Sequence, residues 1–289
     1  NIVREDETLI ANTLASSTWS INMFLGSALG GIAAVWLGRE AVFTLDSVSF
    51  LLSALLLSRM KFVEPHLASR PPARLRDFFD HSEVVEGMRY VRRDRRLVAN
   101  IFIKGALGVT GASWVIFPIL GKDVFPVRGA ITPEHGALLG MAFLMGARGL
   151  GSLIGPLATA PWAEQHFGRL RAGILAGFAA SGLGYIALAW TTDRWFAYTV
   201  VVISHMGSAV VWVFSTTLLQ LMTEDRFRGR VFAAELAFCT IALAATSFAA
   251  GWLMDHGLGV RALAGYTGVL ALIAAGWWAV AGTGESTAS

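Results

Sequence analysis

The chain has 289 residues, of which 55% are hydrophobic and only 15% charged, whereas charged residues make up about 25% of an average soluble domain. So few charges cannot cover the surface of a water-soluble protein of this size, so the composition excludes an ordinary soluble domain and indicates that lipid is the solvent. The net charge of +3 is small, and the basic residues lie in short gaps between apolar runs. This placement argues against a nucleic-acid-binding face.

Long apolar stretches dominate the chain. A bilayer core about 30 Å thick needs roughly 17 to 25 apolar residues per helix. Eight stretches meet this length: 10–37, 41–59, 97–120, 136–159, 170–190, 195–221, 231–254 and 262–282. The sequence therefore predicts an all-α fold, a polytopic membrane helix bundle with eight transmembrane helices.

One long polar segment, 61–96, separates the second stretch from the third. It holds nine of the 23 Lys and Arg residues and six of the 20 Asp and Glu residues. Within it Leu75, Phe78, Val85 and Met88 recur at helical spacing, which predicts a short amphipathic helix on the membrane surface. The alternative is a solvated helix that only links two bundles.

The basic residues also predict the orientation, because Lys and Arg concentrate in cytoplasmic loops. With the first helix starting in the cytoplasm, 16 of them fall on that side and five on the outer side. We therefore expect a multi-pass protein of the cell membrane with both ends of this chain in the cytoplasm.

Charged residues inside apolar stretches are costly and so are functional candidates. Arg148 lies near the middle of its stretch, and because it cannot plausibly lose its proton it would bind an anion or pair with an acid. Lys104 lies nearer the cytoplasmic edge, and we expect its side chain to reach the interface.

Three other ionisable residues could exchange protons. Asp46 lies near the outer end of the second stretch, His205 in the middle of the sixth, and Glu235 one turn into the seventh. His205 could instead be a hydrogen-bonded packing residue. Glu235 could instead lie at the interface and pair with Arg228 or Arg230.

Small residues and turns complete the pattern. Gly26, Gly30 and Gly31 predict close helix packing. A second run, from Gly146 to Pro156, contains Gly151 and Gly155; it lies in an apolar helix without a preceding strand, so it is not a nucleotide-binding loop.

Two cytoplasmic turns share a pattern of acids and arginines. Gly168 permits a tight first turn beside Glu164 and Arg169. The second turn runs through Asp225 to Arg230. Acids of one turn pairing with arginines of the next would latch the cytoplasmic face.

Motifs for catalysis, metals and cofactors are absent from the sequence. The six histidines form no His-x-x-x-His pair, there is no Gly-x-Ser-x-Gly elbow, and the single cysteine, Cys239, permits no Cys-based metal site. We therefore expect no enzyme activity, no cofactor and no metal.

These residues resemble a known family, the major facilitator superfamily of secondary transporters, and most closely its branch of enterobactin-type siderophore exporters and macrolide efflux proteins. The resemblance covers residues 1–283. It is carried by the stretches Glu7 to Asn12, Gly26 to Gly31, Asp46 to Ser53, Glu86 to Asp94, Gly151 to Arg169 and Leu218 to Val231. The proline of the family's antiporter-type motif is replaced by Ser27.

The family has twelve helices in two bundles of six, so the resemblance implies that this chain supplies helices five to twelve and that four precede it. Residues 1–60 would then end the first bundle, 61–96 form the linker, 97–283 form the second bundle, and 284–289 a tail.

The resemblance also implies alternating access driven by an ion gradient, with outward transport of a small amphipathic molecule by proton antiport. The expected partners are that substrate, a proton and the lipid bilayer, with no nucleic acid and a monomeric full-length protein. Candidate pathway residues are Asn22, Asp46, Trp114, Arg148, His205 and Trp212. Candidate gate residues are Glu164, Arg169, Asp225, Arg228, Arg230 and Glu235.

Two other classes remain open. A non-transporting membrane assembly subunit would suit a native eight-helix chain, and a membrane-embedded enzyme would need paired acids or histidines at one depth.

Overall fold

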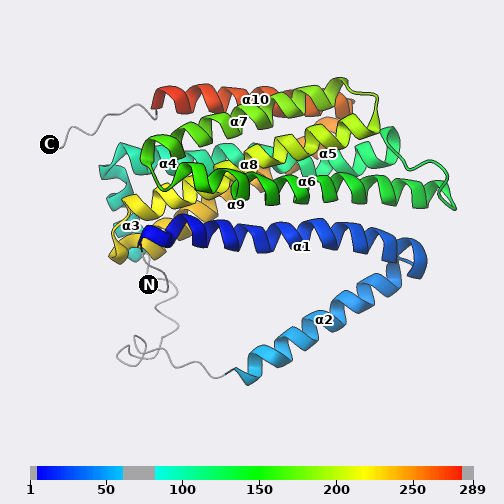
Figure 1. The fold of residues 1–289 in the computed structure, drawn as a ribbon, viewed down its shortest axis with the longest axis horizontal. Coiled ribbons are helices and arrows are strands. Elements are labelled where there is room, and N and C mark those ends of the chain that lie inside the picture. The colour runs from blue at the N-terminus through cyan, green and yellow to red at the C-terminus, as the bar shows by residue number, and fades with distance from the viewer. Residues whose placement is uncertain (1–4, 61–81, 282–289) are drawn as a thin grey trace.

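In the computed structural model, which describes residues 5–60 and 82–281, every regular element is a helix (Figure 1). The helices are α1 (Thr8–Leu37), α2 (Arg39–Arg59), α3 (Ser82–Arg93), α4 (Arg95–Leu107), α5 (Ser113–Ile119), α6 (Pro133–Ala163), α7 (Phe167–Trp190), α8 (Arg194–Met222), α9 (Asp225–Asp255) and α10 (Val260–Ala281). Three short segments of other helix types supplement them: the 3-10 helices η1 (Glu5–Glu7) and η3 (Gly108–Ala112), and the π-helix η4 (Leu120–Val124).

The predicted spans are confirmed, because eight helical segments are long and apolar enough to cross a membrane. The third of them, Arg95–Val124, is not one regular helix but the series α4, η3, α5 and η4. It carries Pro118, which lacks the N–H that a regular helix needs. Composite helices of this kind are tolerated in lipid only where protein buries them, and more than half of this span is buried.

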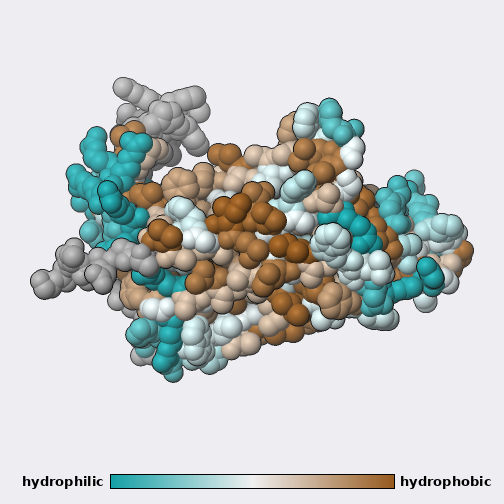
Figure 2. All heavy atoms as spheres, turned by 90° about the horizontal axis from the view of Figure 1, so that it is seen from above, coloured by the Kyte–Doolittle hydropathy of each residue, from teal (hydrophilic) through white to brown (hydrophobic). Residues whose placement is uncertain are grey.

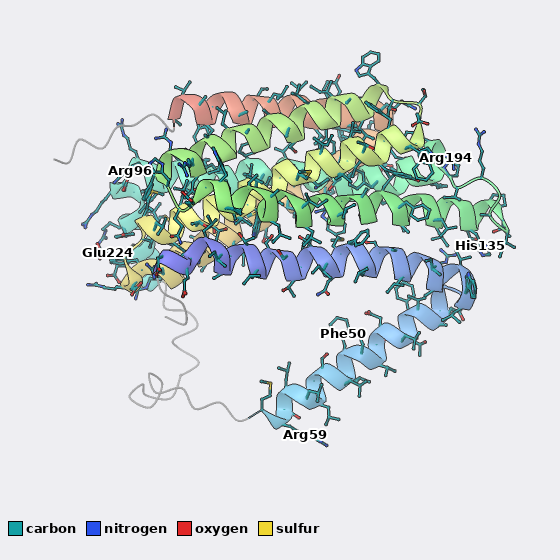
Figure 3. All side chains as sticks on the ribbon, viewed as in Figure 1. Phe50, Arg59, Arg96, His135, Arg194 and Glu224 are labelled. Atoms are coloured by element: carbon teal, nitrogen blue, oxygen red, sulfur yellow. The ribbon has the colours of Figure 1, made fainter. Side chains whose placement is uncertain are left out.

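The surface agrees with a membrane-spanning bundle. Figure 2 shows apolar residues gathered over the middle of the visible face and hydrophilic residues at its two ends. Arg96 and Glu224 lie at one end, beside α3, and His135 and Arg194 lie at the other (Figure 3). We call these the α3 end and the far end. The chain is therefore a multi-pass membrane protein.

Helices α4 to α10 form one bundle, and α1 lies along its α6 side (Figure 1). One buried cluster joins Leu170, Ile174 and Phe214 near one end, and another surrounds Phe117 and Leu144. Helix α2 meets α1 at the far end and then diverges, and it has no buried residue. Phe50 shows this exposure in Figure 3. The division of the chain into domains stays a prediction.

Close helix contacts are made by only some of the predicted glycines. A Cβ added at Gly151 or Gly155 would collide with the α8 backbone at Val202 or Met206, so these two positions accept only glycine. Gly31 likewise contacts Ala142 of α6.

The prediction of close packing is wrong for Gly26 and Gly30, which have no described atom within 4 Å of an added Cβ. The contact between α1 and α6 runs through Phe24 and Gly31. These two residues are seven apart and share one face of α1, whereas Gly26 and Gly30 lie on the opposite face.

Helix α3 docks on the bundle with the face opposite to the one that was predicted to lie on the membrane surface. Val85 and Met88 are half exposed, whereas Gly87 and Val91 are buried. The side chain of Tyr90 stacks on Phe227 of α9 with ring centroids 4.1 Å apart. Leu75 and Phe78 lie outside the described residues. The packing face is thus chosen by the fit to α9 and not by apolar spacing alone.

The turn after α6 also differs from the prediction. Gly168 lies inside α7, and the left-handed backbone is adopted by Glu164 and Gln165, with φ of 45° and 57°. Such a residue is a common helix end, because the left-handed position turns the chain out of the helix.

The α6–α8 contact generates the first prediction. Gly151→Ala and Gly155→Ala should each lower the stability of the protein by about 1–3 kcal/mol, because the added methyl group must push two backbones apart. Thermal unfolding in detergent would measure it. Gly276→Ala, at an exposed helical glycine with no neighbour within 4 Å, is the matched control. Equal melting temperatures for all three variants would contradict the prediction.

Candidate functional site

A cavity of about 480 Å³ lies between α1 and the bundle. Its wall is formed by residues of α1, of the third span, of α6, α8 and α9. The third span lines the cavity at Gly108 and Thr110, inside the 3-10 helix η3, and at Trp114. Its size falls in the range of about 300–1,000 Å³ that is typical of small-molecule sites.

Four of the predicted pathway residues line this cavity together. They are Trp114, Arg148, His205 and Trp212. They come from three separate spans, and only His205 and Trp212, seven residues apart on α8, share a helical spacing that joins them. Whether they act in transport stays a prediction, but their convergence is a structural fact.

Arg148 presents a charged group to the cavity wall. Its Nη1 donates a hydrogen bond to Ser113 Oγ at 3.1 Å, and its guanidinium carbon lies 4.6 Å from the centroid of the Trp114 ring. Its Nε is buried without a hydrogen-bond partner among the described residues. Of the two roles that the sequence left open, pairing with an acid is therefore not seen in the described part of the chain.

His205 is a hydrogen-bonded histidine. It is 2% exposed, and its Nε2 lies 3.1 Å from the hydroxyl of Tyr185. Phe117 packs edge-on against the same imidazole, with centroids 5.6 Å apart. These contacts hold the ring in place at the cavity wall. The surroundings of His205 are therefore those of a hydrogen-bonded packing residue.

Lys104 is the main correction to the sequence analysis. It does not reach the interface: it is 1% exposed, and its Nζ donates to Thr216 Oγ1 at 2.7 Å. The same Nζ lies 3.5 Å from the centroid of the Trp212 ring and 3.7 Å from Glu235 Oε1. Three partners inside the bundle outweigh the hydration that the interface would offer.

Glu235 is correspondingly displaced from its predicted place. It is 4% exposed and pairs with Lys104, not with Arg228 or Arg230. The pair therefore adjoins the cavity wall, since Lys104 contacts Trp212 and Thr216, which both line the cavity. A gating role at the surface is unsuited to a buried carboxylate.

Two predicted pathway residues do not line the cavity. Asn22 and Asp46 are both exposed, on α1 and α2. Serines on the polar face of α1, and Asn12, do line it. Asn12 Nδ2 donates to Thr217 Oγ1 at 3.0 Å and to Gln220 Oε1 at 2.6 Å, which ties α1 to α8.

Trp19 was not among the predicted pathway residues, whereas Asn12 is one of the small polar residues of the first span that suit a helix facing a bundle or cavity. Their signal was present in the dilution of the first span by small polar residues at Ser16 and Ser20. A helical wheel places these four residues on one side of α1, but only the structure shows which helices that side faces.

The other gate candidates lie at the α3 end and pair locally. Arg169 bonds to Glu164 of its own turn at 2.8 Å, and Arg228 pairs with Asp225 one helical turn away. The contact between separate elements is made by Glu86 of α3, with Arg226 at 2.7 Å and Arg230 at 2.6 Å. The predicted exchange of partners between the two turns is thus replaced, in these contacts, by a clamp from the linker helix.

The charge of Glu86 depends on this clamp. The hydrogen bond from Arg226 lowers the pKa of Glu86 from its ordinary value of 4.5, slight burial opposes this, and the charges of Arg230 and Arg226 lower it further. The carboxylate therefore stays ionised and paired at neutral pH.

Comparison with known proteins shows which proteins the chain is similar to. It is 29% identical over 218 residues to the "Tetracycline resistance protein, class C" of Escherichia coli, a match that covers 73% of this chain and 50% of that protein. It is 26% identical over 276 residues to the "Uncharacterized MFS-type transporter YfmI" of Bacillus subtilis, covering 95% of this chain and 64% of that protein. No protein-family model matches the chain.

The chain is homologous to transporters of the major facilitator superfamily. The relatives, together with the eight apolar spans, confirm the predicted resemblance and the prediction that the chain is not an enzyme. The chain spans between half and two thirds of the length of these relatives. The finer resemblance to siderophore exporters and macrolide efflux proteins stays a prediction.

The buried ion pair generates the second prediction. Lys104→Met or Glu235→Leu alone should destabilise the protein by about 3–5 kcal/mol, because each leaves one buried charge without its partner. The double variant should regain much of that loss. Thermal unfolding of the four proteins gives the coupling energy of a double-mutant cycle. A double variant that loses the sum of the two single losses would show that the charges do not interact.

The Glu86 clamp generates the third prediction. Because the pKa of Glu86 is lowered in the docked state, its contribution to docking is complete above its ordinary value of 4.5 and is lost as the pH falls through the lowered pKa. Spin labels at Met88→Cys and Leu236→Cys, with Cys239→Ser, would report the distance between α3 and α9. We expect it to lengthen only in acid.

Glu86→Gln is the control for this measurement, since glutamine has the same shape and does not titrate. It should show weaker docking already at pH 7 and no further change in acid. A distance in Glu86→Gln that follows the original protein at every pH would exclude Glu86 as the titrating group.

Proposed function

We propose that the protein is a secondary active transporter that exports a small amphipathic molecule by alternating access. One observation carries this proposal: a cavity within the apolar spans whose wall combines an arginine, a histidine and hydroxyl side chains with tryptophans. Polar groups at membrane depth are costly, and they persist where a substrate or ion path requires them. The names of the two relatives, one for tetracycline resistance and one for transport, support the same function.

The arrangement of helices supports alternating access. The cavity lies between α1 on one side and the bundle α4 to α10 on the other, so a tilt of α1 against α6 would change its opening. The broken third span beside the cavity is typical of transporter binding sites. The hydrogen bonds of Asn12 join α1 to α8, so a tilt that separates these two helices at the α3 end would break them.

Proton entry is the proposed driving force. Glu235 and His205 are the candidate proton-exchanging groups within the bundle: His205 lines the cavity, and Glu235 pairs with Lys104 beside its wall. By the distribution of basic residues, we assign the α3 end to the cytoplasm and the protein to the cell membrane. Export would then carry the substrate from the α3 end to the far end.

The proposal is tested in an efflux-deficient bacterial strain that expresses the full-length protein. Accumulation of a panel of amphipathic compounds would be measured, beginning with tetracycline because one relative is named for resistance to it. We expect at least one compound to accumulate less, and a protonophore to restore its accumulation. If no compound changes, the protein is not an exporter of this class. If the protonophore has no effect, proton coupling is wrong.

The fourth prediction concerns Arg148. Arg148→Ala should abolish efflux of the compound identified in that screen while the amount of protein in the membrane stays the same. Lys122→Ala, which removes an exposed positive charge at the far end, should retain efflux. Unchanged transport by Arg148→Ala would exclude a role for this residue in the pathway.

A further inference from the structure

We propose that the cavity selects amphipathic organic anions, in which an aromatic ring carries a carboxylate, phenolate or sulfonate group, and that Arg148 is the residue that binds the negative charge. The inference rests on the proposed function and narrows it to one class of substrate.

The charge of Arg148 has no acidic partner among the described residues. Its guanidinium contacts the neutral hydroxyl of Ser113 and the ring of Trp114, and its buried Nε has no hydrogen-bond partner in the described structure. An arginine keeps its proton in a protein. A permanent charge in such a place lacks compensation, and a bound anion supplies it with bidentate geometry that suits carboxylates.

The remainder of the cavity does not cancel this charge. Among the described residues that line it there is one arginine, one histidine and no aspartate or glutamate. Glu235 does not line the cavity and is paired with Lys104, whose Nζ lies over the Trp212 ring. The charges of that pair offset each other, so the cavity wall as a whole is positive.

The aromatic part of the ligand is indicated by three tryptophans from three different elements. Trp19 of α1, Trp114 of α5 and Trp212 of α8 all line the cavity, and each is between 39% and 52% exposed. Flat rings with open surface favour stacking of another ring. Polar hydroxyls on α1 and α8 surround them, as an amphipathic ligand requires.

The same tryptophans disfavour a cationic ligand. Cations bind the faces of tryptophan rings, but the Trp114 ring already carries Arg148 and the Trp212 ring already carries Lys104. An entering ammonium group would meet two positive side chains at the faces that could attract it. The positive charge of the wall and the tryptophan faces already occupied by cations both favour a negatively charged ligand.

The test compares three probes that share one ring and differ in charge: 2-naphthoate, 2-naphthylmethanol and 2-naphthylmethylammonium. The full-length protein is placed in nanodiscs of zwitterionic lipid, and binding is measured by equilibrium dialysis, with empty nanodiscs subtracted. We expect 2-naphthoate to bind about tenfold or more tightly than the ammonium probe, a modest effect for a partly buried charge. Equal binding, or tighter binding of the ammonium probe, would overturn the inference.

Variants locate the effect. Arg148→Gln should remove the preference, Arg148→Lys should keep part of it, and Lys122→Gln, an equal charge change at an exposed site, should leave it intact. Ser152→Asp should also remove it, because it places a carboxylate in the cavity wall one helical turn from Arg148. If Arg148→Gln binds none of the probes, the preference measured for Ser152→Asp and Arg148→Lys decides whether Arg148 is its source. A preference that survives in both Arg148→Gln and Ser152→Asp would assign it to another part of the protein.

This experiment separates the inference from the proposed function, because it measures binding without a gradient. Charge-selective binding without export in the efflux-deficient strain would contradict the transport proposal and leave the anion selectivity standing. Export without charge-selective binding would contradict the anion selectivity and leave the transport proposal standing.

Discussion

A charge inside an apolar span must find its partner within the protein, and the structure is organised by the two ways in which this chain meets that constraint. Lys104 and Glu235 lie 131 residues apart and satisfy each other, with help from Thr216 and Trp212. Arg148 has hydroxyl and aromatic contacts but no carboxylate in the described structure. In the first arrangement the two charges compensate each other. In the second, the charge of Arg148 remains uncompensated at the wall of a cavity.

This difference connects packing to function. The closed pair fixes α4, α8 and α9 to one another, so the wall behind Trp212 is held by charge as well as by apolar contact. A rigid wall allows α1, on the opposite side, to be the element that moves. Its contacts with α6 and α8 include Phe24 against Gly149, Gly31 against Ala142 and the amide of Asn12, and Leu9 of α1 belongs to a buried cluster, so a movement of α1 must exchange apolar contacts as well as hydrogen bonds.

The sequence predicted some of this well and some of it not at all, for physical reasons. Span positions follow from length and hydropathy, which are local properties, so all eight were found. The partner of Lys104 depends on contacts between distant spans, and no local rule distinguishes a lysine that reaches the interface from one that turns inward. The docking face of α3 is likewise absent from the sequence prediction, since the fit of Tyr90 and Gly87 to α9 depends on contacts between distant segments. Four cavity residues were identified because charge and aromatic type at mid-span already restrict where they can lie.

The positive cavity also constrains how a proton could drive transport. A proton entering a site that holds the charge of Arg148 is repelled, and a bound anion lowers that repulsion while its departure restores it. In the proposed mechanism, protonating Glu235 would leave Lys104 without its acid, beside the wall residues Trp212 and Thr216. A second uncompensated positive group near the anion would hold it more tightly, which is the coupling of cotransport. The proposed antiport, in which proton entry expels the substrate, therefore requires that Lys104 stay away from the anion when Glu235 is protonated.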